Sequence, residues 1–245
     1  MTMESDSGES TFTTHVTSRG MTINVLDNSV WHALVGRHRH HATGRGAARH
    51  YPRDIAPFSA ILEPTDQAYA DLAADLPAGA EARLFRPTEE PLPPGWDDVG
   101  RFPMLQMVAT RTPEEDDDAV SPLSSDDAGA MLDLVALAQP GPFGARTPLL
   151  GRYLGAWSGN RLIAMAGERL RVAGHVELSA ICVHPEARGQ GHAGRLVRRL
   201  MRLAFENGEV PFLHVRPDNK PAIELYRHLG FEVRRELMVL WRRPR

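Results

Sequence analysis

The feature that most constrains this chain is a short glycine-bearing turn between a strand-like segment and a helical one. Apolar and β-branched residues over 176–183 predict a strand, and apolar residues recur at helical spacing from Ala193 to Ala204. The turn itself, residues 188–193, reads RGQGHA. A strand, turn and helix in this order direct several backbone N–H groups and the positive end of a helix dipole at one spot. Such a spot suits a phosphate.

The glycines of this turn admit more than one interpretation. Gly189 and Gly191 let the backbone approach a diphosphate without a Cβ in the way, and Arg188 can add a charge-assisted hydrogen bond. The same residues also suit an ordinary tight strand–helix connection. With Gly194 they match a dinucleotide-binding fingerprint, which requires a doubly wound domain and an acidic residue after a second strand. The turn lies too late in 245 residues for such a domain, and Glu206 stands at the end of the helix. Dinucleotide binding is therefore disfavoured.

Two motifs together identify a family. Residues 188–193 resemble the Q/R-x-x-G-x-G/A signature of the GNAT family of acetyl-CoA-dependent N-acetyltransferases. Downstream, residues 219–231 read N-x-x-A-x-x-L-Y-x-x-L-G-F, which is similar to a second GNAT motif at the expected distance. The C-terminal block is most similar to the FR47-like branch of the family.

The resemblance implies a fold and a domain organisation. The expected fold class is α/β (α+β), the GNAT acyl-CoA N-acyltransferase fold, with a mixed, mostly antiparallel sheet flanked by helices and a smaller N-terminal α/β segment. The expected order is a strand from about Met104, two helices, three antiparallel strands, then helix, strand, helix and strand. We predict a disordered tail over 1–20, an accessory or degenerate GNAT-like segment over 21–103, and the acetyltransferase domain over 104–245.

The chemistry implied is acyl transfer from a thioester to an amine, which requires a proton acceptor for the amine and a donor for the oxyanion. By resemblance, backbone N–H groups of Ile181, Cys182 and Val183 supply the oxyanion donor. Glu177 stands eleven residues before Arg188, as does the catalytic Glu of the histone-acetyltransferase branch. Its place in a partly buried strand predicts a raised pKa, which suits a general base. The alternative is that Glu177 only hydrogen-bonds substrate or water.

Other residues carry secondary roles in this interpretation. Tyr226 matches the tyrosine of the second motif and would protonate or hydrogen-bond the CoA sulfur; alternatively it packs between helix and sheet. Asn219 would bond the cofactor, a role compatible with capping its helix. Cys182 lacks an evident activating His and is interpreted as a small buried hydrophobe. His184 is the next candidate base, and the role of His214 is left open.

The predicted cofactor site combines strand, turn and helix start. It comprises Ile181, Cys182, Val183, Arg188, Gly189, Gln190, Gly191, His192, Ala193, Gly194 and Asn219. No metal is predicted. The histidines at 38–41 lie in a polar, Gly-rich stretch without the carboxylate or thiolate partners that a metal site usually adds.

Composition sets the remaining expectations. From residue 140 onward the chain has 18 Lys and Arg against 9 Asp and Glu, which suits a phosphate-rich cofactor. A nucleic-acid interpretation of this charge lacks a known motif. One cysteine fits a reducing cytosol, and no apolar run approaches the ~20 residues of a membrane span. We therefore expect a cytoplasmic enzyme, monomer or homodimer, that binds acetyl-CoA and an amine acceptor but neither nucleic acid nor membrane. The alternative is a catalytically silent acyl-CoA-binding sensor or scaffold.

Overall fold

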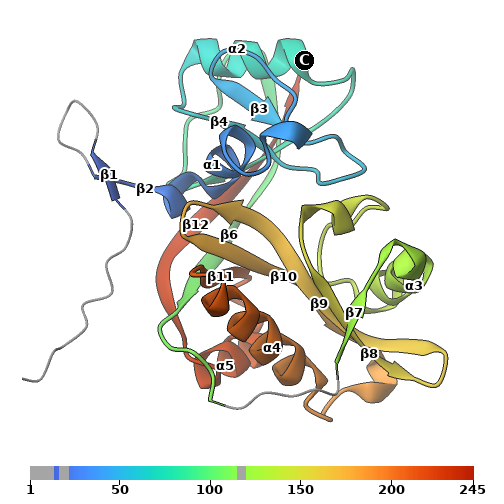
Figure 1. Cartoon of the computed structure of the whole chain (residues 1–245). Helices are drawn as coiled ribbons and strands as arrows, with labels where there is room; N and C mark the ends of the chain where they lie inside the picture. The colour runs from blue at the N-terminus through green and yellow to red at the C-terminus, as the bar shows by residue number, and fades with distance from the viewer. Residues whose placement is uncertain (1–13, 17–21, 115–119) are drawn as a thin grey trace, which may run out of the picture.

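The computed structural model of the chain describes residues 14–16, 22–114 and 120–245 (Figure 1). The predicted tail, residues 1–20, lies outside these residues except for the short strand β1 (Thr14–Val16), which pairs with β2 (Thr22–Asn24).

An eight-stranded sheet dominates the molecule. Its spatial order is β5-β12-β6-β11-β10-β9-β8-β7. The strands are β5 (Ala82–Arg86), β6 (Trp96–Ala109), β7 (Ser121–Leu123), β8 (Tyr153–Ser158), β9 (Arg161–Val172), β10 (His175–Val183), β11 (Val210–Val215) and β12 (Phe231–Pro244). All neighbouring pairs are antiparallel except β10 and β11, which are parallel. The predicted fold class, a mixed and mostly antiparallel sheet flanked by helices, is confirmed.

The helices and the remaining strands surround this sheet. The α-helices are α1 (Ser29–Val35), α2 (Asp66–Asp75), α3 (Ala128–Ala138), α4 (His192–Glu206) and α5 (Lys220–His228). Short 3-10 helices are η1 (Val25–Asn28), η2 (Arg39–His41), η3 (Ser125–Asp127), η4 (Thr147–Leu150) and η5 (Pro185–Ala187). A second hairpin pairs β3 (Ala48–His50) with β4 (Ser59–Ile61). None of the helices in the described part of the chain is long and apolar enough to cross a membrane.

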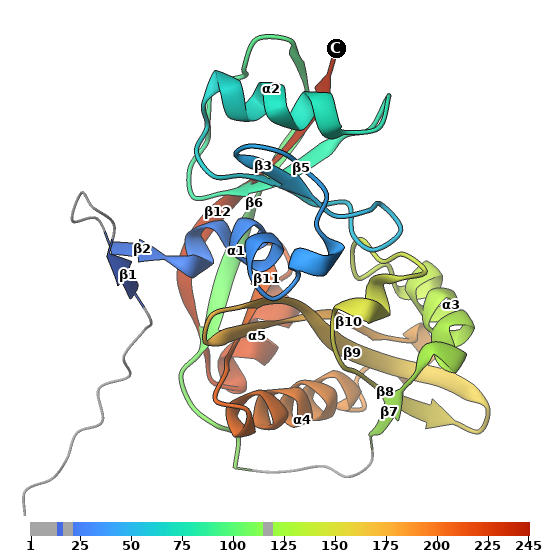
Figure 2. The ribbon, with the colours of Figure 1, turned by 45° about the horizontal axis from the view of Figure 1, so that its top comes forward.

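The sheet has a different apolar core on each face, because successive side chains of a strand point to opposite sides. Met107 and Leu213 pack with α4 and α5, whereas their neighbours Val108 and Phe212 pack with the N-terminal elements. Figures 1 and 2 show α4 and α5 on one side of the molecule and α1, α2, β3 and β4 on the other. The helix α4 lies against the sheet through Leu196, Val197, Leu200 and Met201, the first three of which belong to the predicted helical spacing.

The expected element order is correct except between β6 and β8. There the described residues contain one α-helix, α3, where two were expected. Gln139, with a left-handed φ of 48°, ends α3, and the prolines at 140 and 142 then prevent a second helix. β8 and β9, the first two of the three expected antiparallel strands, pair as a hairpin with Gly159 at a φ of 58° in its turn.

The N-terminal residues share the main sheet with the rest of the chain. β5 is its edge strand, and β6 begins at Trp96, so it crosses the predicted boundary at residue 104. Leu26 and Leu34, both fully buried, belong to the same apolar cluster as Phe212 of β11. The division into an accessory segment and a catalytic domain stays a prediction, and this packing favours joint folding.

A chain that starts at Gly100 should therefore fail to fold stably. It would lack β5, the first residues of β6 and the apolar cover over Phe212, and each large side chain exposed in this way costs about 1.5–3 kcal/mol. We expect loss of a cooperative thermal transition by circular dichroism, together with aggregation. A soluble fragment with full acetylation activity would instead make residues 21–103 an independent module.

Candidate active site

The parallel strands β10 and β11 separate after a short stretch of pairing. Their ladder runs from the His175–Val210 pair to the Glu177–Phe212 pair and ends there. Beyond this point a cavity of about 1010 Å³ is lined by both strands, the glycine turn, α4 and α5. It also reaches residues on the opposite face of the sheet, among them Phe58, Phe85 and Phe102. One cavity thus joins the two faces through the gap between the strands.

A β-bulge lies in β10 beside this gap. Ser179 is opposite Gly167 and Cys182 is opposite Met165, so β10 holds one residue more than β9 over this stretch. Ala180 within the bulge has a φ of 52°, which is unusual for a residue other than glycine. Such backbone strain is typical of functional sites. The predicted oxyanion donors, Ile181, Cys182 and Val183, all line the cavity.

The glycine turn presents open backbone to the cavity. Gly189 and Gly191 have φ values of 76° and 78°, which favour glycine. A Cβ on Gly189 would meet no atom within 4 Å, and one on Gly191 only Arg195 Nη1 at 3.6 Å. Gly191 is also the N-cap residue of α4, and it has no side chain that could accept a hydrogen bond. The first backbone N–H groups of α4 therefore lack the acceptor that a capping side chain would provide. The turn fits a diphosphate.

Two further side chains beside the turn fit an anion. Arg198 and His192 line the cavity, and the Arg198 Nε and His192 Nε2 atoms are buried without a hydrogen-bond partner in the described part of the chain. Sequence analysis did not single out Arg198. Arg198 could have been predicted from its position four residues after Gly194, because residues i and i+4 share one face of a helix. The structure agrees, since a Cβ on Gly194 would lie 3.6 Å from Arg198 Nη1.

The structure places the other predicted cofactor residues as follows. Arg188, Ala193, Gly194 and Asn219 line the cavity. Asn219 also caps α5, where its Oδ1 accepts from the Ala222 N–H at 3.3 Å, and its role in cofactor binding stays a prediction. Gln190 is not among the lining residues.

The Gln190 side chain turns back toward the preceding 3-10 turn. Its Nε2 donates to the Glu186 carbonyl oxygen at 3.4 Å. Any contribution of Gln190 to cofactor binding would therefore come from its backbone.

Glu177 lies at the point where β10 and β11 separate, but it does not line the cavity. Its side chain is 0% exposed. The carboxylate accepts from Arg169 Nε at 2.9 Å and Nη2 at 2.6 Å, and lies 2.7 Å from His214 Nδ1. Arg169 comes from β9 and His214 from β11, so three adjacent strands build this cluster. The guanidinium also stacks on the Phe58 ring, 4.8 Å from its centroid.

The predicted raised pKa of Glu177 is wrong. Burial does oppose ionisation of the carboxyl group, but Arg169 and His214 outweigh it and hold the pKa low, at about 2. The strand sequence gave no sign of either partner. Glu177 is thus an ionised, paired group at neutral pH, which is a weak proton acceptor.

His214 connects Glu177 to a longer polar chain. Its Nε2 lies 3.1 Å from Gln106 Nε2, so the network favours the tautomer in which Nδ1–H donates to Glu177 and Nε2 accepts from Gln106. Gln106 also donates to the Leu26 carbonyl at 2.9 Å and accepts from Arg234 at 2.7 Å. His214 is a lining residue, yet its imidazole is 0% exposed. The cluster is thus tied to the N-terminal elements.

Two lining residues keep their protons at neutral pH. Burial raises the pKa of Tyr226 and of Cys182, each to about 12. Tyr226 can therefore donate a proton into the cavity, and it also packs against Phe231, with ring centroids 6.0 Å apart. Cys182 stays a thiol, which disfavours a covalent acyl-enzyme. His184 caps η5 by accepting from the Glu186 N–H at 3.3 Å and is not among the lining residues.

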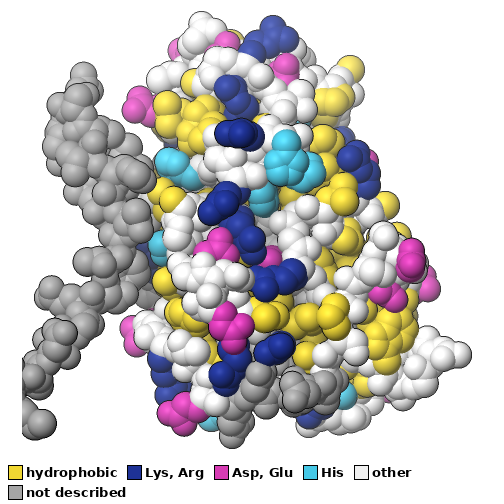
Figure 3. All heavy atoms as spheres, viewed as in Figure 1, with side chains coloured by type: hydrophobic (Ala, Val, Ile, Leu, Met, Phe, Trp, Pro, Cys, Tyr) yellow, Lys and Arg dark blue, Asp and Glu magenta, His cyan; other side chains and the backbone are white. Residues whose placement is uncertain are grey.

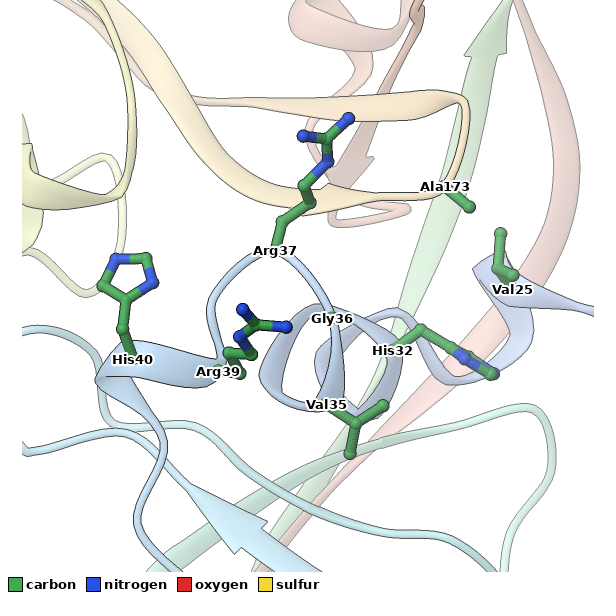
Figure 4. A pocket seen from close by; sticks show the side chains of 8 residues that line it. All are labelled: Val25, His32, Val35, Gly36, Arg37, Arg39, His40 and Ala173. Atoms are coloured by element: carbon green, nitrogen blue, oxygen red, sulfur yellow. The ribbon is translucent and has the colours of Figure 1, made fainter.

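A second hollow lies beside α1 and η2. Figure 4 shows His32 and His40 at opposite ends of it, and its arginine and histidine side chains do not converge on one point. His38 is buried instead, with Nδ1 2.8 Å from the Tyr51 hydroxyl. Among the described residues no group of three or more His, Cys, Asp or Glu side chains could hold a metal ion.

Basic side chains form an interrupted column down one face of the molecule, with acidic side chains beside its lower half (Figure 3). The buried Glu168 accepts from both Arg152 and Arg171. On α4, Arg202 donates to the carbonyls of Pro113 and Glu114. Part of the positive charge of the C-terminal half is therefore used inside the protein.

Comparison with known proteins agrees with this geometry. The family model described as FR47-like protein matches residues 153–240. A solved structure assigned to the GNAT acetyltransferases, from Novosphingobium aromaticivorans, is 33% identical, with a TM-score of 0.83 over 90% of this chain and 98% of that one. A GCN5-related N-acetyltransferase from Kribbella flavida, 19% identical, shares the fold with a TM-score of 0.58, over 88% of this chain and 95% of that one.

Two curated relatives match the C-terminal region. N-alpha-acetyltransferase RimI from Mycobacterium tuberculosis is 42% identical over 83 residues, which is 33% of this chain and 51% of that protein. An uncharacterised protein of Mycobacterium leprae is 39% identical over 85 residues, which is 33% of this chain and 23% of that protein. The chain thus spans about half of one relative and less of the other.

The fold, the site and the full-length match to the Novosphingobium structure define the class. This chain belongs to the GNAT family of acetyltransferases. The predicted resemblance to this family is confirmed.

Proposed function

We propose that this protein transfers the acetyl group of acetyl-CoA to a primary amine of a small molecule or peptide, by direct transfer in a ternary complex. The observation that carries the proposal is one continuous cavity. It joins the glycine turn at the start of α4 to a compartment on the opposite face of the sheet, through the gap between β10 and β11. A donor and an acceptor can enter this cavity from opposite faces of the sheet and meet at the gap.

The residues present fit acetyl-CoA. The turn at Gly189 and Gly191, the start of α4, and the guanidinium groups of Arg188 and Arg198 would hold the diphosphate. Acetyl-CoA supplies an acetyl group activated as a thioester. Backbone N–H groups of the β10 bulge, around Ile181, would polarise its carbonyl oxygen.

The proton of the acceptor amine needs a route out of the cavity. No Asp or Glu of the described chain lines the cavity, whereas His214 lines it and contacts Glu177 at 2.7 Å. In our proposal a water molecule in the cavity accepts the amine proton beside His214 and passes it to bulk solvent, and the Glu177 anion, bonded to His214 Nδ1, stabilises the positive charge on that water. Glu177 then acts through His214 and not as the direct base. Tyr226 donates to the departing sulfur.

Two further observations bear on the class of the acceptor and on the cellular compartment. The relative from Mycobacterium tuberculosis bears the name N-alpha-acetyltransferase, which makes an α-amine a candidate acceptor here too. A single cysteine and the use of acetyl-CoA suit the cytoplasm. The alternative function, a silent acyl-CoA-binding sensor or scaffold, gives no role to a protonated phenol such as Tyr226 in the cavity.

Thiol release from acetyl-CoA, measured against a panel of amines, amino acids and peptides, tests the proposal. Tyr226→Phe should lower kcat about 10- to 100-fold, without rescue at higher pH, because a leaving thiolate gains nothing from alkaline medium. Calorimetric affinity for acetyl-CoA should stay within a few-fold of the native value. Tight acetyl-CoA binding with no turnover of any amine would favour the sensor.

A further inference from the structure

The compartment across the gap has an apolar wall built by strand register. Phe85, Val239 and Phe102 are directly opposite one another on β5, β12 and β6, so their side chains share one face of the sheet. All three line the cavity, together with Phe58, whose ring meets that of Phe85 edge-on at 5.4 Å. A substrate that lies along this wall contacts mainly hydrocarbon.

The wall ends at a positive charge. Arg83 is two residues before Phe85 on β5, so it lies on the same face, and it also lines the cavity. Its guanidinium stacks on the Trp241 ring, 4.3 Å from the centroid. The Glu81 carboxylate, which raises the pKa of Arg83, accepts from Trp241 Nε1 at 2.7 Å and from Arg243. In the described chain, no hydrogen bond or ion pair joins Arg83 to a carboxylate.

A second arginine increases the positive potential at this end. Burial lowers the pKa of Arg83, the Glu81 carboxylate raises it, and Arg53, in the loop before β4, lowers it by a smaller amount. Arg53 makes no hydrogen bond or ion pair with a carboxylate of the described chain, and it is not among the residues that line the cavity. The guanidinium that faces the cavity is therefore that of Arg83, and a guanidinium suits a carboxylate.

The distance to the reaction point sets the length of the substrate. β11 borders the gap, and β5 lies three strands away through β6 and β12. At about 4.8 Å per strand, the two strands are about 14 Å apart across the sheet. Arg83 is level with Gly100 of β6, whereas Val215 at the gap is level with Leu105, so the two points are also about 16 Å apart along the strands and about 22 Å apart in all. A free amino acid is far too short to bridge this distance, whereas an extended peptide, rising about 3.3 Å per residue, covers it in about seven residues.

We infer that the acceptor is a peptide whose terminal amine lies at the gap, whose next residues are apolar, and whose carboxylate side chain near the seventh residue binds Arg83. This inference rests on the proposed acetyl transfer and specifies its acceptor. Arg83 then selects the substrate without taking part in the chemistry.

Matched peptides test the inference. The probes are the amidated heptapeptides Ala-Phe-Leu-Ala-Leu-Ala-Glu, Ala-Phe-Leu-Ala-Leu-Ala-Gln and Ala-Glu-Leu-Ala-Leu-Ala-Phe, which share length and terminal amine. The first should have a kcat/KM about tenfold or more above the other two, since charge-assisted hydrogen bonds form only there. Arg83→Ala should remove this preference, and Arg83→Lys should retain part of it. Arg101→Ala is the control, because Arg101 lies on β6, is 54% exposed and is not among the lining residues.

Calorimetry of the same peptides in the presence of CoA separates the inference from the proposed function. If no amine is acetylated, the proposed function fails, and a binding preference for the Glu peptide that disappears in Arg83→Ala still supports the anion site. If acetylation occurs but the Glu and Gln peptides react equally, or Arg83→Ala keeps the preference, the inference is overturned and the proposed function stands. Melting temperatures confirm that each variant is folded.

Discussion

Glu177→Gln should destabilise the folded protein by about 3–5 kcal/mol and reduce kcat by at least an order of magnitude. Removing one partner of a buried ion pair leaves the other charge uncompensated, and this accounts for the loss of stability. Here the remaining charge is Arg169, which is 10% exposed and donates two hydrogen bonds to the Glu177 carboxylate. Activity falls because His214 loses the anion at its Nδ1.

The pH dependence of stability identifies the carboxylate. Because the pKa of Glu177 is lowered from 4.5 to about 2 on folding, its contribution is fully present above pH 4.5 and is lost as the pH falls toward 2. Urea unfolding of the native protein from pH 6 to pH 3 should therefore show a loss of stability. In Glu177→Gln, the part of this loss of stability that comes from protonation of Glu177 should be absent.

Glu168→Gln is the matched control for the catalytic part. Glu168 is also a buried glutamate, 1% exposed and paired with two arginines, but it is not among the residues that line the cavity. Both variants should be less stable, whereas kcat of the folded fraction should fall only for Glu177→Gln. Raising the pH should partly restore that kcat if the lost step is proton transfer. If Glu177→Gln had the melting temperature and nearly the turnover of the native protein, Glu177 would have neither the structural role nor the catalytic role assigned to it.

Local patterns predicted the part of the site that is local in sequence. The strand before the turn, the turn itself and α4 follow one another along the chain, so spacing and glycine chemistry were enough to place Gly189, Gly191 and the start of α4. Asn219 and Tyr226 belong to one short helix, and a helix fixes which of its residues face the same way. Both line the cavity.

The remainder depends on contacts between strands that are distant in sequence. Glu177 was predicted from its spacing to the turn, but its environment is made by Arg169 on β9 and His214 on β11. No periodicity within one strand encodes which side chain of the next strand will be opposite. The same reason explains why β5 was not predicted as part of the main sheet, since only its pairing with β12 brings it there.

The turn should show the largest effect on cofactor affinity. Gly191→Val should raise the acetyl-CoA dissociation constant at least tenfold, because a branched side chain would occupy the space that the diphosphate needs. That space is empty in the protein itself, since the nearest atom to a Cβ on Gly191 is Arg195 Nη1 at 3.6 Å. The φ of 78° adds strain of about 1–3 kcal/mol, so a control for backbone effects is required.

Gly208→Val provides this control. Gly208 has a φ of 69°, a Cβ there would meet no atom within 4 Å, and it follows the C-terminal end of α4, outside the cavity lining. The two variants should lose similar stability in thermal unfolding, but only Gly191→Val should lose acetyl-CoA affinity by calorimetry. Arg198→Ala should weaken binding less, about 5- to 30-fold, because the backbone donors of the turn remain. If folded Gly191→Val binds acetyl-CoA with native affinity, the diphosphate does not lie on this turn, and the cofactor must enter the cavity from the other face of the sheet.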